Sequence, residues 1–177
     1  MMRRFVASGA ENHLTFLLGA GASTSSGLPD WDELAVRMLI ESQAVPDREA
    51  AELLVRRQDP LIVAEATRKH RDSEWDRMVQ RALYQEGLGP TPSALHLATA
   101  AHALSGDGTD TTLITLNFDV LLEDALGLGT DLPVDSRVDD QFGAGRYVVH
   151  HLHGIVSPDQ VCSPVLTLSD FNELLGD

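Results

Sequence analysis

Leu14-Thr-Phe-Leu-Leu-Gly-Ala-Gly-Ala-Ser23 joins an apolar run to a loop with two glycines. The first five residues lie between polar residues and a glycine, which predicts a buried parallel strand. Gly19 and Gly21 would then permit a close backbone approach that a β-carbon blocks. We expect the amides after Gly21 to be free to face an anion at the start of a helix. A tight strand-to-loop turn without a ligand is the alternative.

This loop departs from two familiar phosphate-binding patterns. Thr24 stands where the dehydrogenase fingerprint has its third glycine, and the lysine of the phosphate-binding loop of ATPases is missing. Both of those interpretations are therefore disfavoured.

Two further motifs follow extended segments in the same way. Thr111-Thr-Leu-Ile-Thr-Leu116 leads into Asn117-Phe-Asp119, and Arg146-Tyr-Val-Val-His150 leads into His151-Leu-His-Gly154. In an open α/β sheet the ligand-binding crevice lies at the carboxyl ends of the strands. The sequence therefore predicts an α/β fold, a three-layer Rossmann-like domain with a mainly parallel sheet and helices on both faces.

Asn117 and Asp119 carry the chemistry expected at the second strand end. An asparagine amide donates and accepts at once, which suits a ribose hydroxyl or a water, and a carboxylate can accept an amide or hydroxyl hydrogen bond. The next segment, Val120-Leu-Leu-Glu-Asp-Ala-Leu126, is expected to be helical. A simple cap of that helix is therefore the alternative role for Asp119.

The histidines at the third strand end are candidates for proton transfer. Because side chains alternate along a strand, His151 and His153 should share one face while His150 points away. The reference pKa of histidine is about 6.5, so a histidine near the sheet crevice could act as a general base at neutral pH. A satisfied core histidine and a two-histidine metal site are the alternatives. The sequence has no acidic or cysteine partner at a spacing that would favour a metal site, so we expect no bound metal.

Helices are predicted between the first and second motifs. Asp30 precedes Trp31-Asp-Glu33 as the N-cap in a variant of the capping box, and its nearness to the glycine loop leaves a ligand contact open. Residues from about 43 to 90 predict a helical insertion of two or three helices. Residues at helical spacing are expected in its core, namely Trp75, Met78, Val79, Ala82 and Leu83.

Two more helices are predicted further along the chain. Thr91-Pro92 should supply a cap and a first-turn proline for a helix that runs through Ala101 and ends near Gly106. His96 and His102 are interpreted as packing or surface histidines. The last helix is expected to start at Ser169.

Composition limits the class of protein. The chain has 177 residues, 43% of them hydrophobic, which suits one domain over residues 1–177. A formal charge of −14 argues against binding to nucleic acid or to anionic membranes. The single cysteine, Cys162, excludes an internal disulfide and a thiolate cluster and favours a cytoplasmic location. We expect neither a signal peptide nor a membrane span.

Taken together, the motifs resemble the sirtuin-like superfamily. Gly19-Ala-Gly-Ala-Ser23 with Gly27-Leu-Pro-Asp30, then Thr115-Leu-Asn-Phe-Asp119, then His151-Leu-His-Gly154 match its order and spacing over about 140 residues. The sequence is most similar to the bacterial sirtuin-like NAD hydrolases, which act in anti-phage defence, rather than to the protein deacylases.

The resemblance implies a role for each motif. NAD would be the substrate, and cleavage of its nicotinamide–ribose bond would give nicotinamide and ADP-ribose without a metal. Asn117 would hold the ribose and the attacking water, Asp119 would reach the nicotinamide side, and His153 would be the catalytic histidine. The pyrophosphate would contact the loop residues Gly19, Ala20, Gly21, Ala22 and Ser23.

The sequence also departs from its relatives. Deacylases usually carry a four-cysteine zinc module after the histidine motif, whereas this chain has Cys162 alone there. Asp32 stands where deacylases tend to have arginine. The chain ends at Asp177, where a complete domain would continue with further strands and a loop for the adenosine half, so we expect a C-terminally incomplete domain.

Three hypotheses for function follow. An NAD hydrolase is favoured, with NAD as its ligand and a homo-oligomer or an activating protein as a further partner. A catalytically inactive module that binds NAD or ADP-ribose, or that docks a partner, is the second. An NAD-dependent protein deacylase is the third and least favoured.

Overall fold

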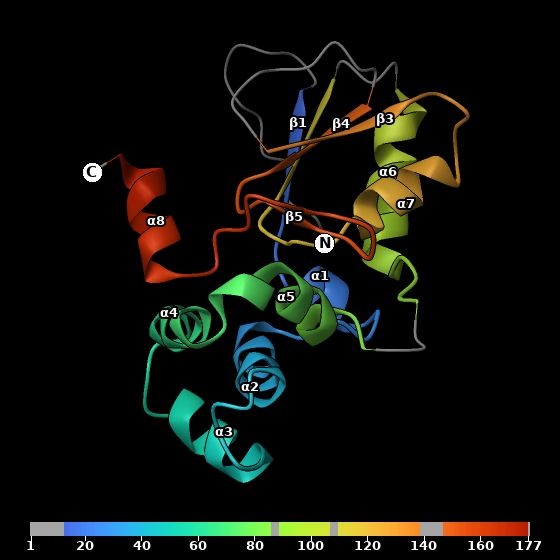
Figure 1. Cartoon of the computed structure of the whole chain (residues 1–177). Helices are drawn as coiled ribbons and strands as arrows, with labels where there is room; N and C mark the ends of the chain where they lie inside the picture. The colour runs from blue at the N-terminus through green and yellow to red at the C-terminus, as the bar shows by residue number, and fades with distance from the viewer. Residues whose placement is uncertain (1–12, 86–88, 107–109, 139–146, 177) are drawn as a thin grey trace.

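The computed structural model describes residues 13–85, 89–106, 110–138 and 147–176. Its main sheet has the strand order β1-β2-β4-β3, and every pair of neighbours is parallel (Figure 1). The four strands are β1 (Leu14–Leu18), β2 (Thr111–Thr115), β3 (Val134–Arg137) and β4 (Tyr147–His151). A separate antiparallel hairpin joins β5 (Ile155–Val156) and β6 (Val161–Cys162).

One face of the sheet is covered by two helices that pack side by side. These are α6 (Ala94–Ser105) and α7 (Leu121–Gly127). Their small residues, such as Ala100 and Ala125, share a buried cluster with Leu113 and Val149 of the central strands. Burial of this apolar surface is the main force that holds the helices on the sheet.

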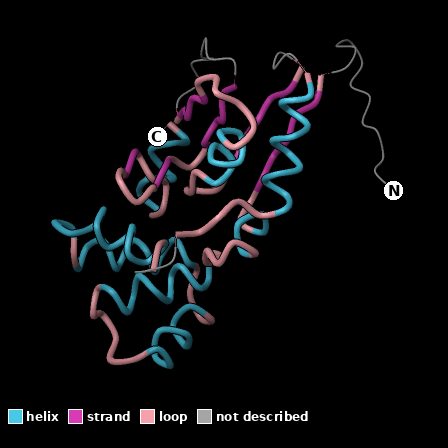
Figure 2. The backbone as a smooth tube through the Cα atoms, turned by 90° about the vertical axis from the view of Figure 1, so that its right-hand side faces the viewer, coloured by secondary structure: helices cyan, strands magenta, loops and turns pink. Residues whose placement is uncertain are grey.

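A second helical layer lies across the carboxyl ends of the strands (Figures 1 and 2). It consists of α2 (Trp31–Glu41), α3 (Arg48–Val55), α4 (Pro60–His70) and α5 (Trp75–Leu83). A short 3₁₀ turn (Asp72–Glu74) precedes α5, the short helix α1 (Gly21–Thr24) follows β1, and α8 (Leu168–Leu175) packs against α4.

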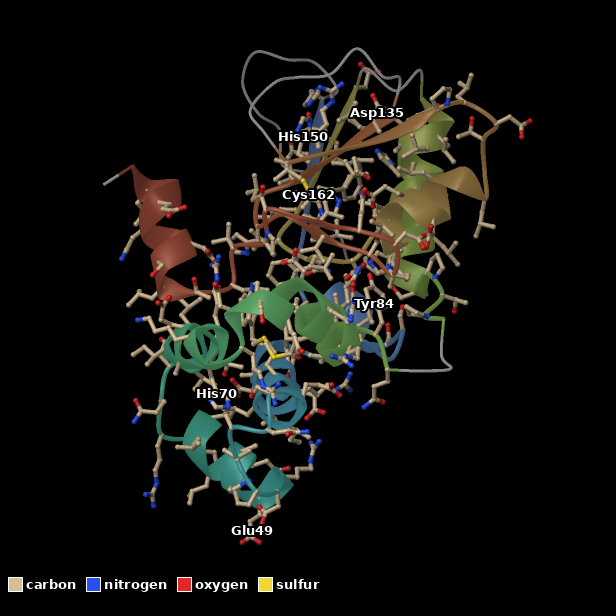
Figure 3. All side chains as sticks on the ribbon, viewed as in Figure 1. Glu49, His70, Tyr84, Asp135, His150 and Cys162 are labelled. Carbon is tan, nitrogen blue, oxygen red and sulfur yellow. The ribbon has the colours of Figure 1, made fainter. Side chains whose placement is uncertain are left out.

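The core of this layer is the one that the sequence predicted. Trp75, Met78 and Val79 of α5 are buried together with Met38 of α2 and Phe118 of the loop after β2. Tyr84 joins the layer to the hairpin, because its hydroxyl donates to the Val156 carbonyl over 2.8 Å (Figure 3). The helical layer therefore forms the floor beneath the strand ends.

The opposite face of the sheet is more open. The Leu17 side chain of the edge strand β1 is 62% exposed, while Ile114 and Val148 on the same face are half-buried. The predicted strand is therefore parallel, but it is buried only at Leu18, because β1 lies at the sheet edge.

Two local expectations need correction, and two elements were missed. Ser93, not Thr91, caps α6, and it does so in a reciprocal capping box with His96. Asp30 caps α2 as predicted, but the Glu33 carboxylate pairs with arginines instead of completing the box. The strand β3 and the hairpin were not predicted.

The overall class agrees with the sequence prediction. Within the described residues the chain is an α/β structure with a four-stranded parallel sheet and eight α-helices, consistent with a Rossmann-like fold. None of the helices in these ranges has the length and apolar character needed to cross a membrane.

Candidate functional site

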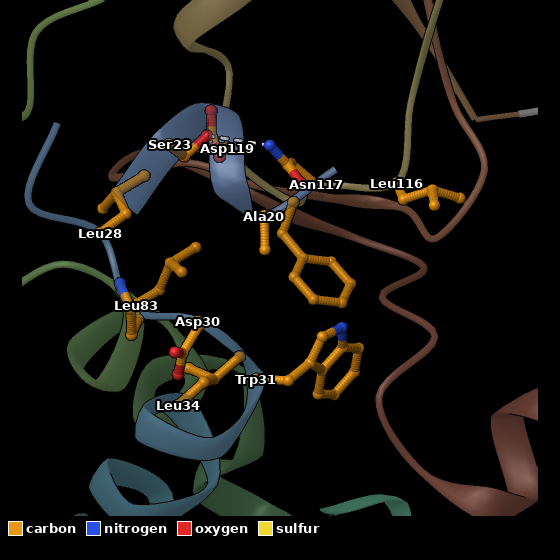
Figure 4. A pocket seen from close by; sticks show the side chains of 12 residues that line it. Ala20, Ser23, Leu28, Asp30, Trp31, Leu34, Leu83, Leu116, Asn117 and Asp119 are labelled. Atoms are coloured by element: carbon orange, nitrogen blue, oxygen red, sulfur yellow. Dashed lines mark hydrogen bonds between the residues drawn. The ribbon is translucent and has the colours of Figure 1, made fainter. Parts of the chain in front are cut away.

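The strand register brings the three motifs together at the carboxyl ends of the parallel strands. Leu18 pairs with Thr115, and Thr115 pairs with His151, so the loops after these strands start side by side. A small pocket lies beside the first two strand ends (Figure 4). Its lining comes from the glycine loop, the start of α2, the end of α5 and the loop after β2: Ala20, Ser23, Leu28, Pro29, Asp30, Trp31, Leu34, Leu83, Leu116, Asn117, Phe118 and Asp119.

Ser23, Asn117 and Asp119 form one hydrogen-bonded chain in the pocket wall. Asn117 Nδ2 donates to Ser23 Oγ over 2.9 Å, and Ser23 Oγ donates to Asp119 Oδ2 over 2.8 Å (Figure 4). All three residues are buried. Asn117 Oδ1 has no hydrogen-bond partner among the residues that the structure describes, so it is the atom of this amide that is left for a ligand.

Asp119 serves both the helix and the site. Its Oδ1 accepts the N–H of Leu121 at the start of α7 over 3.1 Å, while Oδ2 accepts the Ser23 hydroxyl. Burial raises the pKa of Asp119, and the hydrogen bonds from Ser23 and Leu121 act to lower it. The N-cap of α7 is Val120, so Asp119 binds the first N–H of the helix from the preceding position and also fixes the first motif to the second.

The backbone of the glycine loop differs from the expectation. The N–H groups of Ala22 and Ser23 donate to the carbonyls of Gly19 and Ala20, each over 2.9 Å, because the loop winds directly into α1. The amides after Gly21 are therefore not free. Within this loop, the N–H groups of Ala20 and Gly21 have no hydrogen-bond partner among the described residues.

The two loop glycines are not required by the packing of the chain. Neither Gly19 nor Gly21 has a positive φ, and a β-carbon on either would meet nothing within 4 Å. The space above them is open, which suits the close approach of a ligand rather than of another part of the protein.

The opposite wall of the pocket is the start of α2. Asp30 lines the pocket and also accepts the N–H of Glu33 over 2.9 Å as the N-cap. The Trp31 ring meets the Phe118 ring edge-on, with centroids 5.7 Å apart. Trp31 also lines a second, apolar cavity, so this aromatic pair stands between the two cavities.

His153 lies on the far side of the aromatic pair. It lines the second cavity with Trp31 and Phe171, and its ring centroid is 6.3 Å from that of Phe118. Burial lowers the pKa of His153, and a hydrogen bond with the Leu116 backbone acts in the opposite direction. Its Nδ1 is buried without a hydrogen-bond partner in the described residues. A neutral ring with an uncommitted nitrogen suits a proton acceptor.

His151 does not share a face with His153. β4 ends at His151, and a turn follows, so the alternation of side chains stops there. His151 is buried, with Nδ1 3.1 Å from the Asn117 carbonyl oxygen and Nε2 2.7 Å from Glu123 Oε1. The sequence analysis did not predict this contact, although the position of His151 at a strand end beside the second motif could have suggested it.

Gly154 is required by the packing of the chain itself. Its φ is 84°, in the left-handed region that favours glycine. A β-carbon there would lie 2.7 Å from the Cys162 carbonyl oxygen and closer still to the Ser163 carbonyl. The last residue of the third motif therefore lets the hairpin fold back beside His153.

The predicted site residues do not all lie on one cavity. Ala20, Ser23, Asp30, Asn117 and Asp119 line one pocket, and His153 lines the neighbouring cavity. Gly19, Gly21 and Ala22 of the loop are in the lining of neither. Within the described ranges, no three His, Cys, Asp or Glu side chains gather into a group that could hold a metal ion.

Comparison with known families finds a match to the C-terminal segment of the chain. Residues 111–177 match the SIR2-like domain, and this segment contains Asn117, Asp119 and His153. A SIR2-like domain implies the use of NAD. No match to a curated protein was found for the chain. The glycine loop precedes the matched segment and is tied to it by the hydrogen bonds of Ser23.

Proposed function

We propose that this protein hydrolyses the nicotinamide–ribose bond of NAD to give nicotinamide and ADP-ribose. The observation that carries the proposal is that the three motifs meet at the carboxyl ends of neighbouring parallel strands. There the hydrogen-bonded residues Ser23, Asn117 and Asp119 line a pocket. His153 lies on the other side of the aromatic residues that border this pocket. The SIR2-like match over residues 111–177 supports NAD as the ligand.

The groups around the pocket suit the parts of a dinucleotide. The open space over Gly19 and Gly21 would receive the pyrophosphate. The N–H groups of Ala20 and Gly21, unpaired within the described residues, would donate to its oxygens. Asn117 Oδ1 would accept a hydrogen bond from a ribose hydroxyl or from the attacking water.

The proposed reaction needs orientation more than covalent help. The bond between the ribose carbon and nicotinamide breaks, and its electron pair leaves with nicotinamide, whose positive charge is thereby neutralised. Water adds to the ribose carbon, and its proton passes to neutral His153. Fixed dipoles such as the Asn117 amide would position the water and the developing cation, and His153 would add proton transfer.

The test is nicotinamide release from NAD by the purified chain and its variants. We expect His153→Ala to lower turnover by about a hundredfold to ten-thousandfold, and Asn117→Ala by about a hundredfold to a thousandfold. His70→Ala and Asn172→Ala are matched controls, because both residues are exposed, and His70 lies on α4 away from the pocket (Figure 3). Circular dichroism would establish that each variant is folded.

Each outcome separates the proposal from its alternatives. Unchanged turnover in a folded His153→Ala protein would contradict the assignment of the catalytic histidine. NAD binding without release would support an inactive binding module. Release that increases when an acyl-lysine peptide is added would support a deacylase.

A further inference from the structure

His151 makes two hydrogen bonds that a neutral imidazole satisfies poorly. One ring nitrogen faces the Asn117 carbonyl oxygen at 3.1 Å and the other faces Glu123 Oε1 at 2.7 Å. Both partners are acceptors when Glu123 is ionised, so both ring nitrogens must carry a proton. The Ser136 hydroxyl donates to the same Glu123 oxygen over 2.6 Å. The His151 side chain is 0% exposed and that of Glu123 is 10% exposed.

We propose that His151 is a positioning residue, held as a buried imidazolium by Glu123, that fixes the Asn117 loop in the conformation that the proposed NAD site requires. This inference rests on the proposed function. It concerns a charge pair between β4 and α7, outside the set of residues that would contact NAD.

The Asn117 peptide is held from two sides. Its N–H donates to Thr115 Oγ1 over 3.0 Å, and its carbonyl accepts the His151 ring. The side chain is then aimed at Ser23. Loss of the proton on His151 Nδ1 would place a lone pair against the carbonyl oxygen, and the peptide would have to turn. The Asn117 amide, which is the candidate water-holding group, would move with it.

The charges around His151 favour its protonated form. Burial acts to lower the pKa of His151, but the hydrogen bond and charge of Glu123, the Asn117 carbonyl and the charge of Asp119 together raise it above its ordinary value. Glu123 comes from α7 and Asp119 from the loop after β2. A raised pKa means that the ordering of the loop is complete below the ordinary histidine pKa of 6.5 and is lost as the pH rises through the higher folded-state value.

The test combines a titration by NMR with a pH profile. In protein labelled with ¹⁵N-histidine, both His151 nitrogens should be protonated at pH 7, and the Asn117 side-chain amide signals should shift with the same midpoint as His151. Glu123→Gln should lower that midpoint by about one pH unit, a tenfold change in proton affinity. The alkaline limb of nicotinamide release should move by the same amount. A merely structural contact would still lower the His151 midpoint, but it would leave the alkaline limb of nicotinamide release unchanged.

Asp124→Asn is the matched control, because it removes one charge from an exposed position of the same helix. It should leave the His151 midpoint in place. If Glu123→Gln unfolds, the double variant with His151→Gln leaves no buried charge unpaired. In that protein the Asn117 signals should no longer respond to alkaline pH.

A His151 that is neutral at pH 7, or Asn117 signals that do not follow its titration, would overturn the inference. The NMR readouts need no turnover. A protein that releases no nicotinamide but shows the expected titration would therefore contradict the proposed function and leave the role of His151 in place.

Discussion

The two sides of the candidate site are built differently. On the side of the glycine loop, Ser23, Asn117 and Asp119 are buried and bonded to one another. On the other side, His153 keeps a buried Nδ1 with no partner among the described residues, beside the rings of Trp31 and Phe118. Bonded groups hold a fixed geometry, whereas an uncommitted nitrogen is available to a substrate. The bonded residues on the first side therefore suit a structural role, and His153 suits proton transfer.

The glycines of the two sides show the opposite arrangement. Gly19 and Gly21 border open space, while Gly154 is enclosed by the backbone at Cys162 and Ser163. The open glycines suit contact with a ligand, and the enclosed glycine suits the fold. Substitutions can therefore separate loss of binding from loss of structure.

The largest effect is expected for Gly154→Ala. A left-handed φ and contacts with two backbone carbonyls should together cost about 3 to 5 kcal/mol of unfolding free energy. The comparison is Gly21→Ala, which should leave stability unchanged or raise it by less than about 1 kcal/mol, because alanine favours helices. Denaturant unfolding of both variants measures the contrast.

The same glycine pair also tests the proposed ligand. Gly21→Ala should keep the fold and weaken NAD binding, which calorimetry can measure. Full NAD affinity in Gly21→Ala would show that no ligand approaches the loop closely. Equal stability of the two variants would contradict the packing around Gly154.

The next largest effect is expected for Asp119→Ala. It leaves the Ser23 hydroxyl and the Leu121 N–H without their acceptor, so unfolding free energy should fall by about 2 to 4 kcal/mol. His153→Ala should cost less, because it removes one hydrogen bond, with the Leu116 backbone, and Nδ1 has no partner within the described residues.

The stability and the turnover of the two variants should be measured separately. Thermal unfolding monitored by circular dichroism would compare their stabilities, and nicotinamide release would compare their turnover. If His153→Ala proved less stable than Asp119→Ala, the distinction between the two sides of the site would be wrong.

Much of the fold could be predicted from the sequence because its signals are local. The apolar run before Gly19 and the cap at Asp30 need no tertiary information. β3 could not be found in this way. Val134 is its one apolar residue, and the strand exists because it pairs with β4 at the sheet edge. The two-residue strands of the hairpin are too short to show a period.

The sequence predicted that the candidate residues follow neighbouring strands, but it did not predict the hydrogen bonds between their side chains. Placing Ser23 and Asp119 after parallel strands predicted their proximity, and the structure adds their direct hydrogen bond. The turn after His151 stopped the alternation on which the histidine prediction rested. The partner of His151, Glu123, depends on how α7 packs against β4, which a single sequence does not specify.

The smallest expected effect is the pH response of His153, and it sharpens the comparison most directly. Burial lowers the pKa of His153 below its ordinary value of 6.5. The neutral form is then favoured in the folded protein, so its contribution to stability is complete above pH 6.5 and is lost as the pH falls towards the folded-state value.

A base that works in its neutral form should give an acidic limb of kcat/KM below pH 6.5, and ¹⁵N NMR of the His153 ring should titrate at the same pH. The limb should vanish in His153→Gln, while residual turnover no longer depends on acid. A limb above pH 6.5 would mean that a negative charge acts on the ring. His153 would then be held by a charged partner, as the residues on the other side of the site are held by hydrogen bonds, and would not be available as a base.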